Sequence, residues 1–303
     1  MVMNEAMARF NDIPAKSEDS LSGLSFAVSA YFLWGFLPLY MRMLAHVPAA
    51  EVVTHRVIWS IPIAGLVLIV LGRTKDIREA LTSPKMLAMG CVTAALISVN
   101  WGIYVWAINS GHALDAALGY YINPIFSVFL GFALLKERLT RLQWGAIALA
   151  AAAVVVLTID AGRLPLAALG LTVSWGFYAF FKKSLPIGPN QGFLLEVLIL
   201  SIPALAYWAY LGGSGNSHFT TDMWLLLGCG IVTSVPLMLY ANGAKRLRLT
   251  TIAILQYIAP TMIFLVAVFV FGEPFGTARG IAFPMIWAAL VLYTYSMVRN
   301  RDK

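Results

Sequence analysis

Ionisable side chains are rare inside the apolar segments of this chain, so the few that occur are the first candidates for chemistry. His55 and Arg56 lie in one such segment, and Glu196 lies in another. A charge inside lipid is costly, which makes an ionisable residue there a functional candidate by default. The alternative for His55 and Glu196 is an interfacial position from which the side chain reaches the lipid headgroups.

Helical spacing at i, i+4 and i+8 places Glu51, His55 and Trp59 on one face of a helix. Arg56 lies on the adjoining face, and Glu51 could pair with either His55 or Arg56. Arg56 could instead bind a substrate carboxylate, for which its planar guanidinium is suited, or form a structural ion pair. We predict gating or coupling roles for His55, Arg56 and Glu196. We also predict substrate contacts from His55 and Trp59.

Amide and aromatic side chains form a second group of candidates. Asn100 and Tyr104 share a helical face, and we expect this face to point inward because an amide in lipid would lack a hydrogen-bond partner. Inter-helix hydrogen bonding alone is the alternative for Asn100. Aromatic walls could stack against a flat substrate, or serve only in packing and interfacial belts. The predicted substrate-binding residues of this group are Trp34, Asn100, Trp101, Tyr104, Tyr121, Trp175, Tyr178, Tyr240, Gln256 and Tyr257.

Two prolines, Pro124 and Pro260, interrupt apolar segments. A proline inside a helix frees a backbone carbonyl and permits a kink, and the freed group must face a cavity or be satisfied locally. We predict hinge, gating or cavity-lining roles for both. Glu137 and Glu273 follow these prolines at an equal distance, and we interpret them as residues that anchor helix ends and loops.

The elements that carry these residues are membrane-spanning helices. The chain has 303 residues, of which 60% are hydrophobic and 12% charged, whereas a soluble domain carries about 25% charged residues. A helix crosses the hydrocarbon core with about 20 apolar residues. Runs of that length occur at 22–42, 52–72, 85–109, 113–135, 141–159, 165–182, 191–211, 221–244, 249–271 and 277–298.

The placement of basic residues predicts an orientation. If the N-terminus is cytoplasmic, 17 of the 21 Lys and Arg residues fall in cytoplasmic segments, and only Arg42, Arg163 and Arg279 fall at outer ends. This distribution follows the positive-inside rule. We therefore expect a multi-pass protein of the bacterial inner membrane with both termini in the cytoplasm. No signal peptide is expected, because the first 20 residues lack a basic region followed by an apolar stretch.

The two halves of the sequence resemble each other. Trp34-Gly35-Phe36 matches Trp175-Gly176-Phe177 at an offset of 141, and Tyr121-Ile122-Asn123-Pro124 matches Tyr257-Ile258-Ala259-Pro260 at an offset of 136. Each half holds five spans, an odd number, so the second half must enter the membrane inverted. Inverted repeats are an architecture of secondary transporters.

The predicted fold is therefore an all-α polytopic membrane protein with ten transmembrane helices, arranged as two inverted five-helix repeats around a central cavity. We predict a cytoplasmic N-terminal segment at 1–20, the first repeat at 21–160, the second at 161–298 and a cytoplasmic tail at 299–303.

Four strings give the chain a family resemblance: Ala30–Gly35, Glu51–Ser60, Leu118–Pro124 and Arg246–Leu249. They resemble the RarD branch of the drug/metabolite transporter superfamily, whose repeat is the EamA domain and which includes the aromatic amino acid exporter YddG. The resemblance covers residues 21–298. It implies ten helices, cytoplasmic termini, a central cavity and export of amino acids, aromatic ones among them, or of related metabolites by alternating access.

Three other functions remain open: an exporter of drugs or other amphipathic metabolites, an integral-membrane lipid-modifying enzyme, and a channel. The sequence lacks a P-loop, a His-Glu-x-x-His string and a Gly-x-Ser-x-Gly elbow. We predict no catalytic residue, metal site or cofactor. The expected partners are a small-molecule substrate and membrane lipid, not nucleic acid, and a monomer is the simplest expectation. Proton-coupled antiport through His55, Glu196 or Asp115 and facilitated diffusion both remain open.

The predicted topology can be tested with reporter tags at the two chain ends. Both tags should be found on the cytoplasmic face, because ten spans return the chain to the side on which it began. Tags on opposite faces would contradict both the span count and the orientation.

Overall fold

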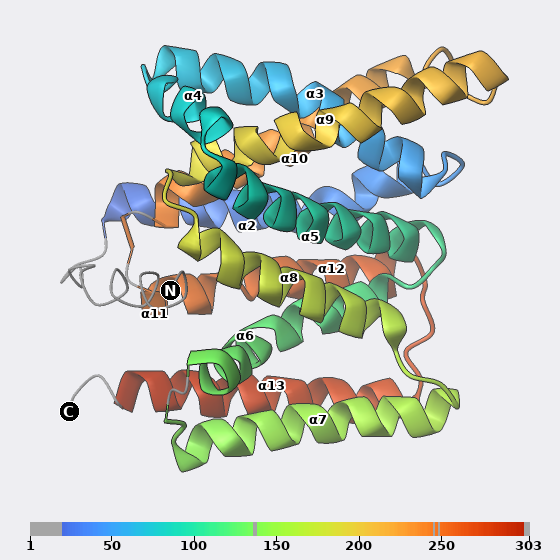
Figure 1. Ribbon diagram of the computed structural model, residues 1–303. Coiled ribbons are helices and arrows are strands. Elements are labelled where there is room, and N and C mark those ends of the chain that lie inside the picture. Colours follow the sequence, from blue (N-terminus) through green and yellow to red (C-terminus); the bar gives the residue numbers. More distant parts are fainter. Residues whose placement is uncertain (1–19, 136–137, 245, 248, 300–303) are drawn as a thin grey trace.

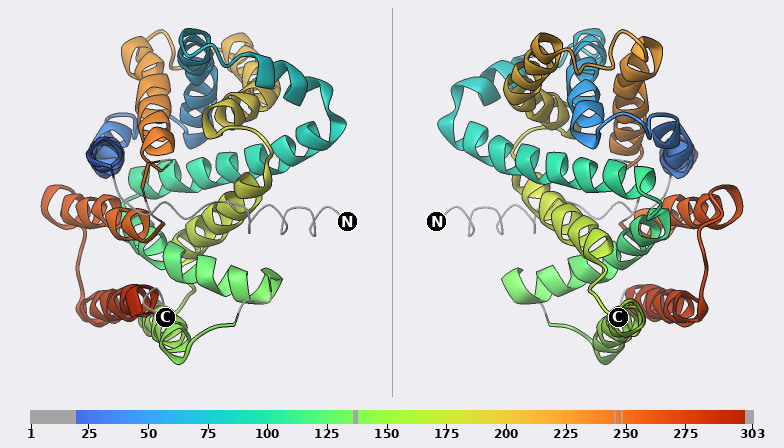
Figure 2. Two further views of the ribbon diagram at one scale, coloured as in Figure 1. Left: turned by 90° about the vertical axis from the view of Figure 1, so that its left-hand side faces the viewer. Right: turned by 90° about the vertical axis from the view of Figure 1, so that its right-hand side faces the viewer.

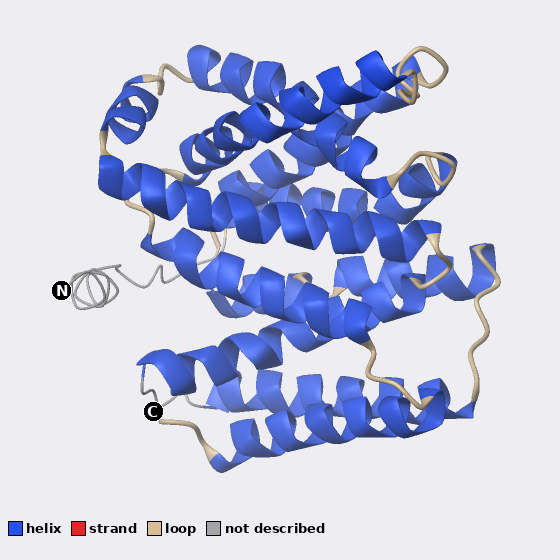
Figure 3. Cartoon of the chain, turned by 45° about the vertical axis from the view of Figure 1, so that its right-hand side comes forward, coloured by secondary structure: helices blue, strands red, loops and turns tan. Residues whose placement is uncertain are grey.

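The computed structural model describes residues 20–135, 138–244, 246–247 and 249–299. The regular structure of these residues is entirely helical (Figure 3). The helices are α2 (Leu21–Met43), α3 (Ala49–Val70), α4 (Lys75–Thr82), α5 (Pro84–Asn109), α6 (Ala113–Leu135), α7 (Arg141–Ala161), α8 (Leu166–Ser184), α9 (Pro189–Ser214), α10 (Met223–Ala244), α11 (Leu249–Leu255), α12 (Ile258–Leu265), the π-helix η1 (Val266–Val270) and α13 (Thr277–Arg299). Glu137, the segment 1–19 and residues 300–303 lie outside the described residues.

Eight of these helices are long and apolar enough to cross a membrane: α2, α3, α5, α6, α7, α9, α10 and α13. Two shorter apolar helical stretches, Leu166–Lys182 and Ile258–Val270, lie in the remaining predicted segments. Large apolar side chains cover the outer surface, and Ile202, Trp224 and Phe269 are each more than three-quarters exposed. A multi-pass membrane protein accounts for this surface, because lipid replaces water around it.

The structure corrects the sequence prediction at two places. The segment predicted as one helix over 249–271 is divided into α11, α12 and η1, with the break at 256–257. Pro260 lies in the first turn of α12, where its missing N–H and its ring are tolerated, whereas both would disrupt a continuous helix. The second correction is α4, a short polar helix that connects α3 to α5 in the gap between the predicted spans 52–72 and 85–109, where no helix was predicted.

Capping side chains and glycines in the turns determine where several helices begin or end. Ser20 caps α2 by accepting a hydrogen bond from the backbone N–H of Gly23 at 3.0 Å, and Thr140 forms a capping box with Gln143 at the start of α7. Gly162 and Gly215 end α7 and α9 with a positive φ, a conformation that glycine adopts without a Cβ clash.

The helices stack in a bundle in which distant parts of the chain interleave (Figure 1). Helices α7 and α13 pair along one edge, while α3, α9 and α10 form the opposite edge; both groupings persist in the rotated views (Figure 2). Between the edges, α2 packs against α10 and α12, and α8 packs against α5 and α6. This arrangement surrounds the middle of the bundle with helices from both halves of the chain.

Helix α10 approaches α3 closely at Gly230. A Cβ added at Gly230 would overlap the backbone carbonyl of Trp59, which cannot move as a side-chain end can. By contrast, a Cβ added at the exposed Gly145 of α7 would meet no heavy atom within 4 Å.

Gly230→Ala should therefore destabilise the protein by about 1–3 kcal/mol, the usual cost of overpacking a tight contact. Gly145→Ala is the matched control and should be neutral or slightly stabilising, because alanine favours helix by up to about 1 kcal/mol over glycine. Thermal melting of both purified variants in detergent measures the difference. Equal melting temperatures would refute the close α3–α10 contact.

Candidate functional site

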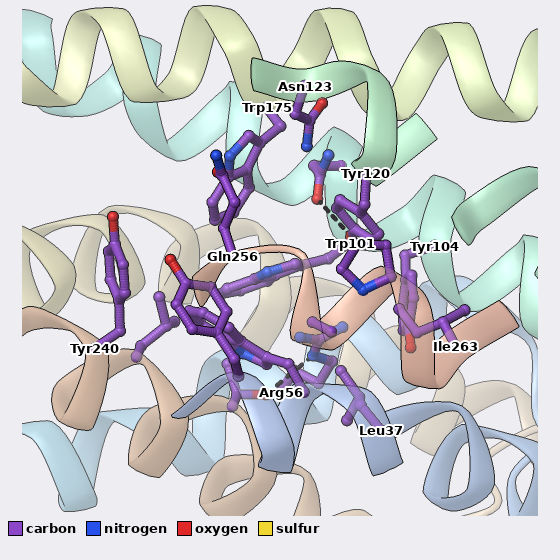
Figure 4. A pocket seen from close by; sticks show the side chains of 17 residues that line it. Leu37, Arg56, Trp101, Tyr104, Tyr120, Asn123, Trp175, Tyr240, Gln256 and Ile263 are labelled. Atoms are coloured by element: carbon purple, nitrogen blue, oxygen red, sulfur yellow. Dashed lines mark hydrogen bonds between the residues drawn. The ribbon is translucent and has the colours of Figure 1, made fainter. Parts of the chain in front are cut away.

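A cavity of about 120 Å³ lies among helices α2, α3, α5, α6, α8, α10 and α12. Figure 4 shows the side chains that surround it. The lining residues are Tyr31, Trp34, Leu37, Arg56, Asn100, Trp101, Tyr104, Tyr120, Asn123, Trp175, Thr233, Leu237, Tyr240, Gln256, Ala259, Pro260 and Ile263. Aromatic side chains predominate, and among these lining residues Arg56 alone is charged.

Arg56 projects from α3 and is 3% exposed. Its Nε donates to Thr233 Oγ1 on α10 at 2.9 Å, and its guanidinium carbon lies 4.6 Å from the ring centroid of Trp101 on α5. Its Nη1 is buried without a hydrogen-bond partner. Within the described part of the chain, no carboxylate lies within ion-pair distance of Arg56. A buried cation without a counterion is costly, so this position favours an anion.

Asn100 joins α5 to α8. Its Nδ2 donates to the carbonyl oxygen of Leu171 at 3.1 Å and to Ser174 Oγ at 2.9 Å. The hydroxyl of Tyr120 donates to Asn100 Oδ1 at 3.4 Å. The amide of Asn100 thus serves inter-helix hydrogen bonding, the alternative considered from the sequence, while its side chain also borders the cavity.

Two other lining groups are buried without partners in the described structure: the hydroxyl of Tyr104 and Oδ1 of Asn123. Figure 4 places Asn123 and Arg56 at opposite sides of the cavity. The cavity therefore offers a positively charged donor, a hydroxyl and an amide oxygen, each with hydrogen-bonding capacity to spare.

Rings from both halves of the chain form the cavity wall. Tyr31 and Trp34 of α2 contact Tyr240 of α10, with centroid separations of 5.8 and 5.6 Å. Tyr120 of α6 meets Trp175 of α8 edge to face at 6.4 Å. Such edge-to-face and tilted pairs are favourable arrangements for aromatic rings, so these contacts also hold the helices together.

Seven of the predicted substrate-binding residues lie together around the cavity: Trp34, Asn100, Trp101, Tyr104, Trp175, Tyr240 and Gln256. Pro260 and Arg56, predicted as gating or coupling residues, also line it. Pro124 is not among the lining residues, although it follows Asn123 directly in α6.

His55 and Trp59 lie elsewhere, near the start of α3. Trp59 Nε1 donates to His55 Nδ1 at 3.1 Å. The His55 ring stacks on Phe219, with centroids 5.2 Å apart, and meets Trp208 edge to face at 5.5 Å. Both residues therefore pack against the loop 215–222 between α9 and α10 and not around the cavity.

Three predicted tyrosines also lie outside the cavity lining. Tyr121 shares a hydrogen bond of 2.7 Å with Thr261, and Tyr257 is partly buried beside the main hydrophobic core. Tyr178 donates to Glu196 Oε2 at 3.2 Å, and Lys182 Nζ lies 2.6 Å from Glu196 Oε1. Glu196 thus lies in a buried ion pair within the second half of the chain.

Glu51 pairs with neither His55 nor Arg56, the two partners considered from the sequence. Its fully buried carboxylate accepts hydrogen bonds from the His218 backbone N–H and from His218 Nδ1, both at 2.7 Å. Ser217 Oγ donates to it at 3.3 Å. These bonds fasten the loop 215–222 to the first turn of α3.

A second contact fastens the same loop to the turn between α2 and α3. His46 Nε2 lies 3.0 Å from Asp222 Oδ2. This hydrogen bond, with a second from Thr221, holds the pKa of the Asp222 carboxyl below its ordinary value. At another turn, Glu273 accepts the N–H groups of Ala113 and Leu114 at 2.6 and 3.0 Å, so it caps α6 as its helix-end prediction required.

The sequence prediction missed eight lining residues: Tyr31, Leu37, Tyr120, Asn123, Thr233, Leu237, Ala259 and Ile263. The internal repeat contained a signal for some of them. The offset of 136 relates Gln256 to Tyr120 and Trp101 to Leu237, and both members of each pair line the cavity. Applying the offset to every predicted residue would have found these two.

Metal chemistry finds no support in the described residues, among which no group of three or more His, Cys, Asp or Glu side chains could hold an ion. Cys91 is exposed and Cys229 is buried, and neither forms a disulfide.

Comparison with known proteins identifies relatives. The EamA-like transporter family matches two segments, residues 21–159 and 164–295. An uncharacterised transporter of Vibrio cholerae serotype O1 is 40% identical over 91% of this chain and 93% of its own. Protein RarD of Streptomyces exfoliatus is 39% identical, over 92% of this chain and 90% of its own. A crystal structure 20% identical in sequence matches with a TM-score of 0.56 over 94% of this chain and all of that chain, a likeness of fold.

The contact between Glu51 and the loop 215–222 yields a prediction. Glu51→Ala should lower the free energy of unfolding by about 1–3 kcal/mol, because the buried N–H of His218 loses its acceptor. Glu51→Gln keeps an acceptor oxygen and should lose less. Thermal melting measures both, with Asp160→Asn, an exposed change on α7, as the control. Wild-type stability of Glu51→Ala would contradict the contact.

Proposed function

The chain belongs to the EamA-like transporter family, and from this premise we propose that it is a secondary transporter that exports small metabolites, in particular amino acids, including aromatic ones. We place it as a monomer in the bacterial inner membrane with both termini in the cytoplasm, and we propose that it works by alternating access.

The observation that carries this proposal is the composition of the cavity wall. Both family-matched segments contribute to it: Arg56 and Trp101 come from 21–159, and Thr233 and Tyr240 come from 164–295. A solute in this cavity would touch both halves at once. Movement of one half against the other could then open the cavity to either side of the membrane in turn.

The pairing of helices supports the inverted repeat on which alternating access depends. Suppose that α2, α3, α5, α6 and α7 correspond in order to α8, α9, α10, the α11–α12–η1 span and α13. The most extensive contacts between the halves then have counterparts, although the smaller α6–α13 and α4–α9 contacts do not. The α2–α10 contact matches α8–α5, the α2–α12 contact matches α8–α6, and the α3–α10 contact matches α9–α5. This correspondence favours ten spans in two repeats, at 21–160 and 161–298.

The cavity residues follow the same correspondence. Five pairs related by the repeat offsets line the cavity on both sides: Trp34 with Trp175, Trp101 with Leu237, Tyr104 with Tyr240, Tyr120 with Gln256, and Asn123 with Ala259. Equivalent walls are what a site between two inverted halves requires, because the site must serve an inward-facing and an outward-facing state.

The size of the cavity favours a small metabolite over a drug. Pockets for drug-sized ligands have volumes of about 300–1,000 Å³, whereas this cavity has about 120 Å³. Its aromatic walls suit an apolar or planar substrate body, and its few polar groups suit a polar head. The size and the lining of the cavity together favour an amino acid as the substrate.

Contacts at the two ends of the bundle suit gates. At the start of α3, Glu51 holds the loop 215–222, and His55 stacks on Phe219. At the opposite end, where α3 leads into α4, Gln191 of α9 donates to Asp76 of α4 at 3.0 Å. Glu196, which the offset of 141 relates to His55, lies one turn further along α9. We propose that His55 and Glu196 belong to gates at opposite faces of the membrane.

The proposal is tested by reconstituting the purified protein in liposomes loaded with an unlabelled amino acid and measuring counterflow of each labelled amino acid. We expect saturable counterflow of at least one, about tenfold or more slower in Trp101→Ala because the cavity wall loses a ring. Repeating the assay with an imposed pH gradient separates proton antiport, which responds to the gradient, from facilitated diffusion.

Protein-free liposomes give the background rate, and Gly145→Ala gives a matched variant outside the cavity. Absence of counterflow for every amino acid would overturn amino acid export. Flux that rises linearly with concentration and never saturates would indicate a channel instead of a carrier.

A further inference from the structure

We propose that this cavity selects substrates with a single carboxylate, and that Arg56 binds this carboxylate while Thr233 and Trp101 hold the guanidinium in place. The inference rests on the proposed transport function and defines the chemical class of its substrate: neutral α-amino acids and other monocarboxylates.

The first argument is the unbalanced charge. Arginine stays protonated in proteins, so its burial at 3% exposure leaves a full positive charge inside the bundle. Arg279, by contrast, pairs with Asp115 and donates to the carbonyl oxygen of Pro274. Arg56 has Thr233 on its Nε and Trp101 against its face, while Nη1 has no partner. The missing partner is an anion.

The second argument is geometry. Trp101 lies over one face of the guanidinium, and Thr233 occupies the Nε donor. These two contacts restrain the side chain, so less conformational freedom is lost when an anion binds. A carboxylate bound through the guanidinium edge forms charge-assisted hydrogen bonds, which are about twice as strong as neutral ones.

The third argument is asymmetry. The offset of 141 relates Arg56 to Val197, so the repeat supplies no second charge to this cavity. One cation can neutralise one carboxylate. A dicarboxylate would bring a second negative charge into the cavity without a partner, and burying an unpaired charge is costly.

The remaining polar groups fit the rest of an amino acid. Oδ1 of Asn123 lies across the cavity from Arg56 and is unpartnered, as is the hydroxyl of Tyr104 (Figure 4). Both oxygens can accept a hydrogen bond from a substrate ammonium or hydroxyl group. A carboxylate at Arg56 and a donor toward Asn123 give the substrate one preferred orientation.

The test compares matched probes on the purified protein in detergent. Isovalerate, hydrocinnamate and L-phenylalanine are each titrated beside their amides, with the thermal melting temperature as the readout. We expect the carboxylates to bind about tenfold or more tightly than the amides, since only the carboxylates pair with the guanidinium. Succinate, with its second carboxylate, should bind more weakly than its monoamide succinamate, because the second negative charge would be buried without a partner.

Three substitutions test which residues cause the preference for carboxylates over amides. Arg56→Met should abolish the preference for carboxylates, and its melting temperature without probe should equal or exceed that of the wild type, because the unpaired charge is gone. Thr233→Val should weaken carboxylate binding and leave amide binding unchanged, as expected of a positioning residue. Arg163→Gln, an exposed change in the turn between α7 and α8, should behave as wild type.

Three results would overturn the inference: equal binding of amides and carboxylates, binding of no carboxylate at all, or a carboxylate preference that survives in Arg56→Met. Amino acid counterflow that persists unchanged in Arg56→Met would also overturn it while leaving the proposed transport intact. Conversely, carboxylate binding that Arg56→Met abolishes, with no amino acid flux in liposomes, would support Arg56 as the carboxylate site and overturn amino acid export.

Discussion

Lipid around a protein forces its polar groups to find partners inside it, and this constraint governs the whole bundle. Most buried polar side chains of the described structure obey it. Asn100 bridges two helices, Glu51 holds three donors of a loop, and Glu273 caps a helix start. Eleven buried side-chain atoms of the described residues have no hydrogen-bond partner, and three of them, on Arg56, Tyr104 and Asn123, border one cavity.

The cavity combines five matched pairs of lining residues with one unmatched charge. Paired residues such as Trp34 and Trp175 allow the cavity to present similar surfaces toward either half of the bundle. A wall made only of such pairs would hold a substrate equally well in two opposite orientations. Arg56, whose repeat equivalent is Val197, removes that equivalence. The result would be a site that serves two conformations and still fixes which end of its substrate faces which helix.

The sequence predicts where the helices lie better than it predicts which face of each helix points toward the cavity. Ten apolar runs anticipated the helical segments, because length and hydropathy report on the requirement to cross lipid. The break at 256–257 and the helix α4 escaped this reasoning, since neither changes the hydropathy pattern. Tyr120 and Tyr121 illustrate the limit for the site. Tyr120 is partly buried and lines the cavity, whereas Tyr121 is buried and forms a hydrogen bond with Thr261. Only the packing of α6 against its neighbours decides which of the two tyrosines faces the cavity.

The repeat predicted the site only in part. Trp34 matches Trp175, and both line the cavity, whereas Tyr121 matches Tyr257, and neither lines it. His55 and Trp59 were predicted from their chemistry and spacing, and they lie instead against Phe219 at the end of the bundle. A repeat offset identifies equivalent positions in the two halves, but the packing of the helices decides whether an equivalent pair faces the cavity.

The hydrogen bond between Arg56 and Thr233 also suggests why such a carrier would favour exchange. It joins α3 of the first half to α10 of the second, so under the proposed alternating access the guanidinium would lie between the parts that move. Without an anion, enclosing Arg56 buries a net positive charge; with a carboxylate bound, the enclosed pair is neutral and the desolvation cost is smaller. A ligand shifts a conformational equilibrium only by its differential affinity for the states involved. A carboxylate that stabilises the enclosed state would therefore speed the crossing of the loaded carrier relative to the unloaded one, and substrate on one side would promote return of substrate from the other.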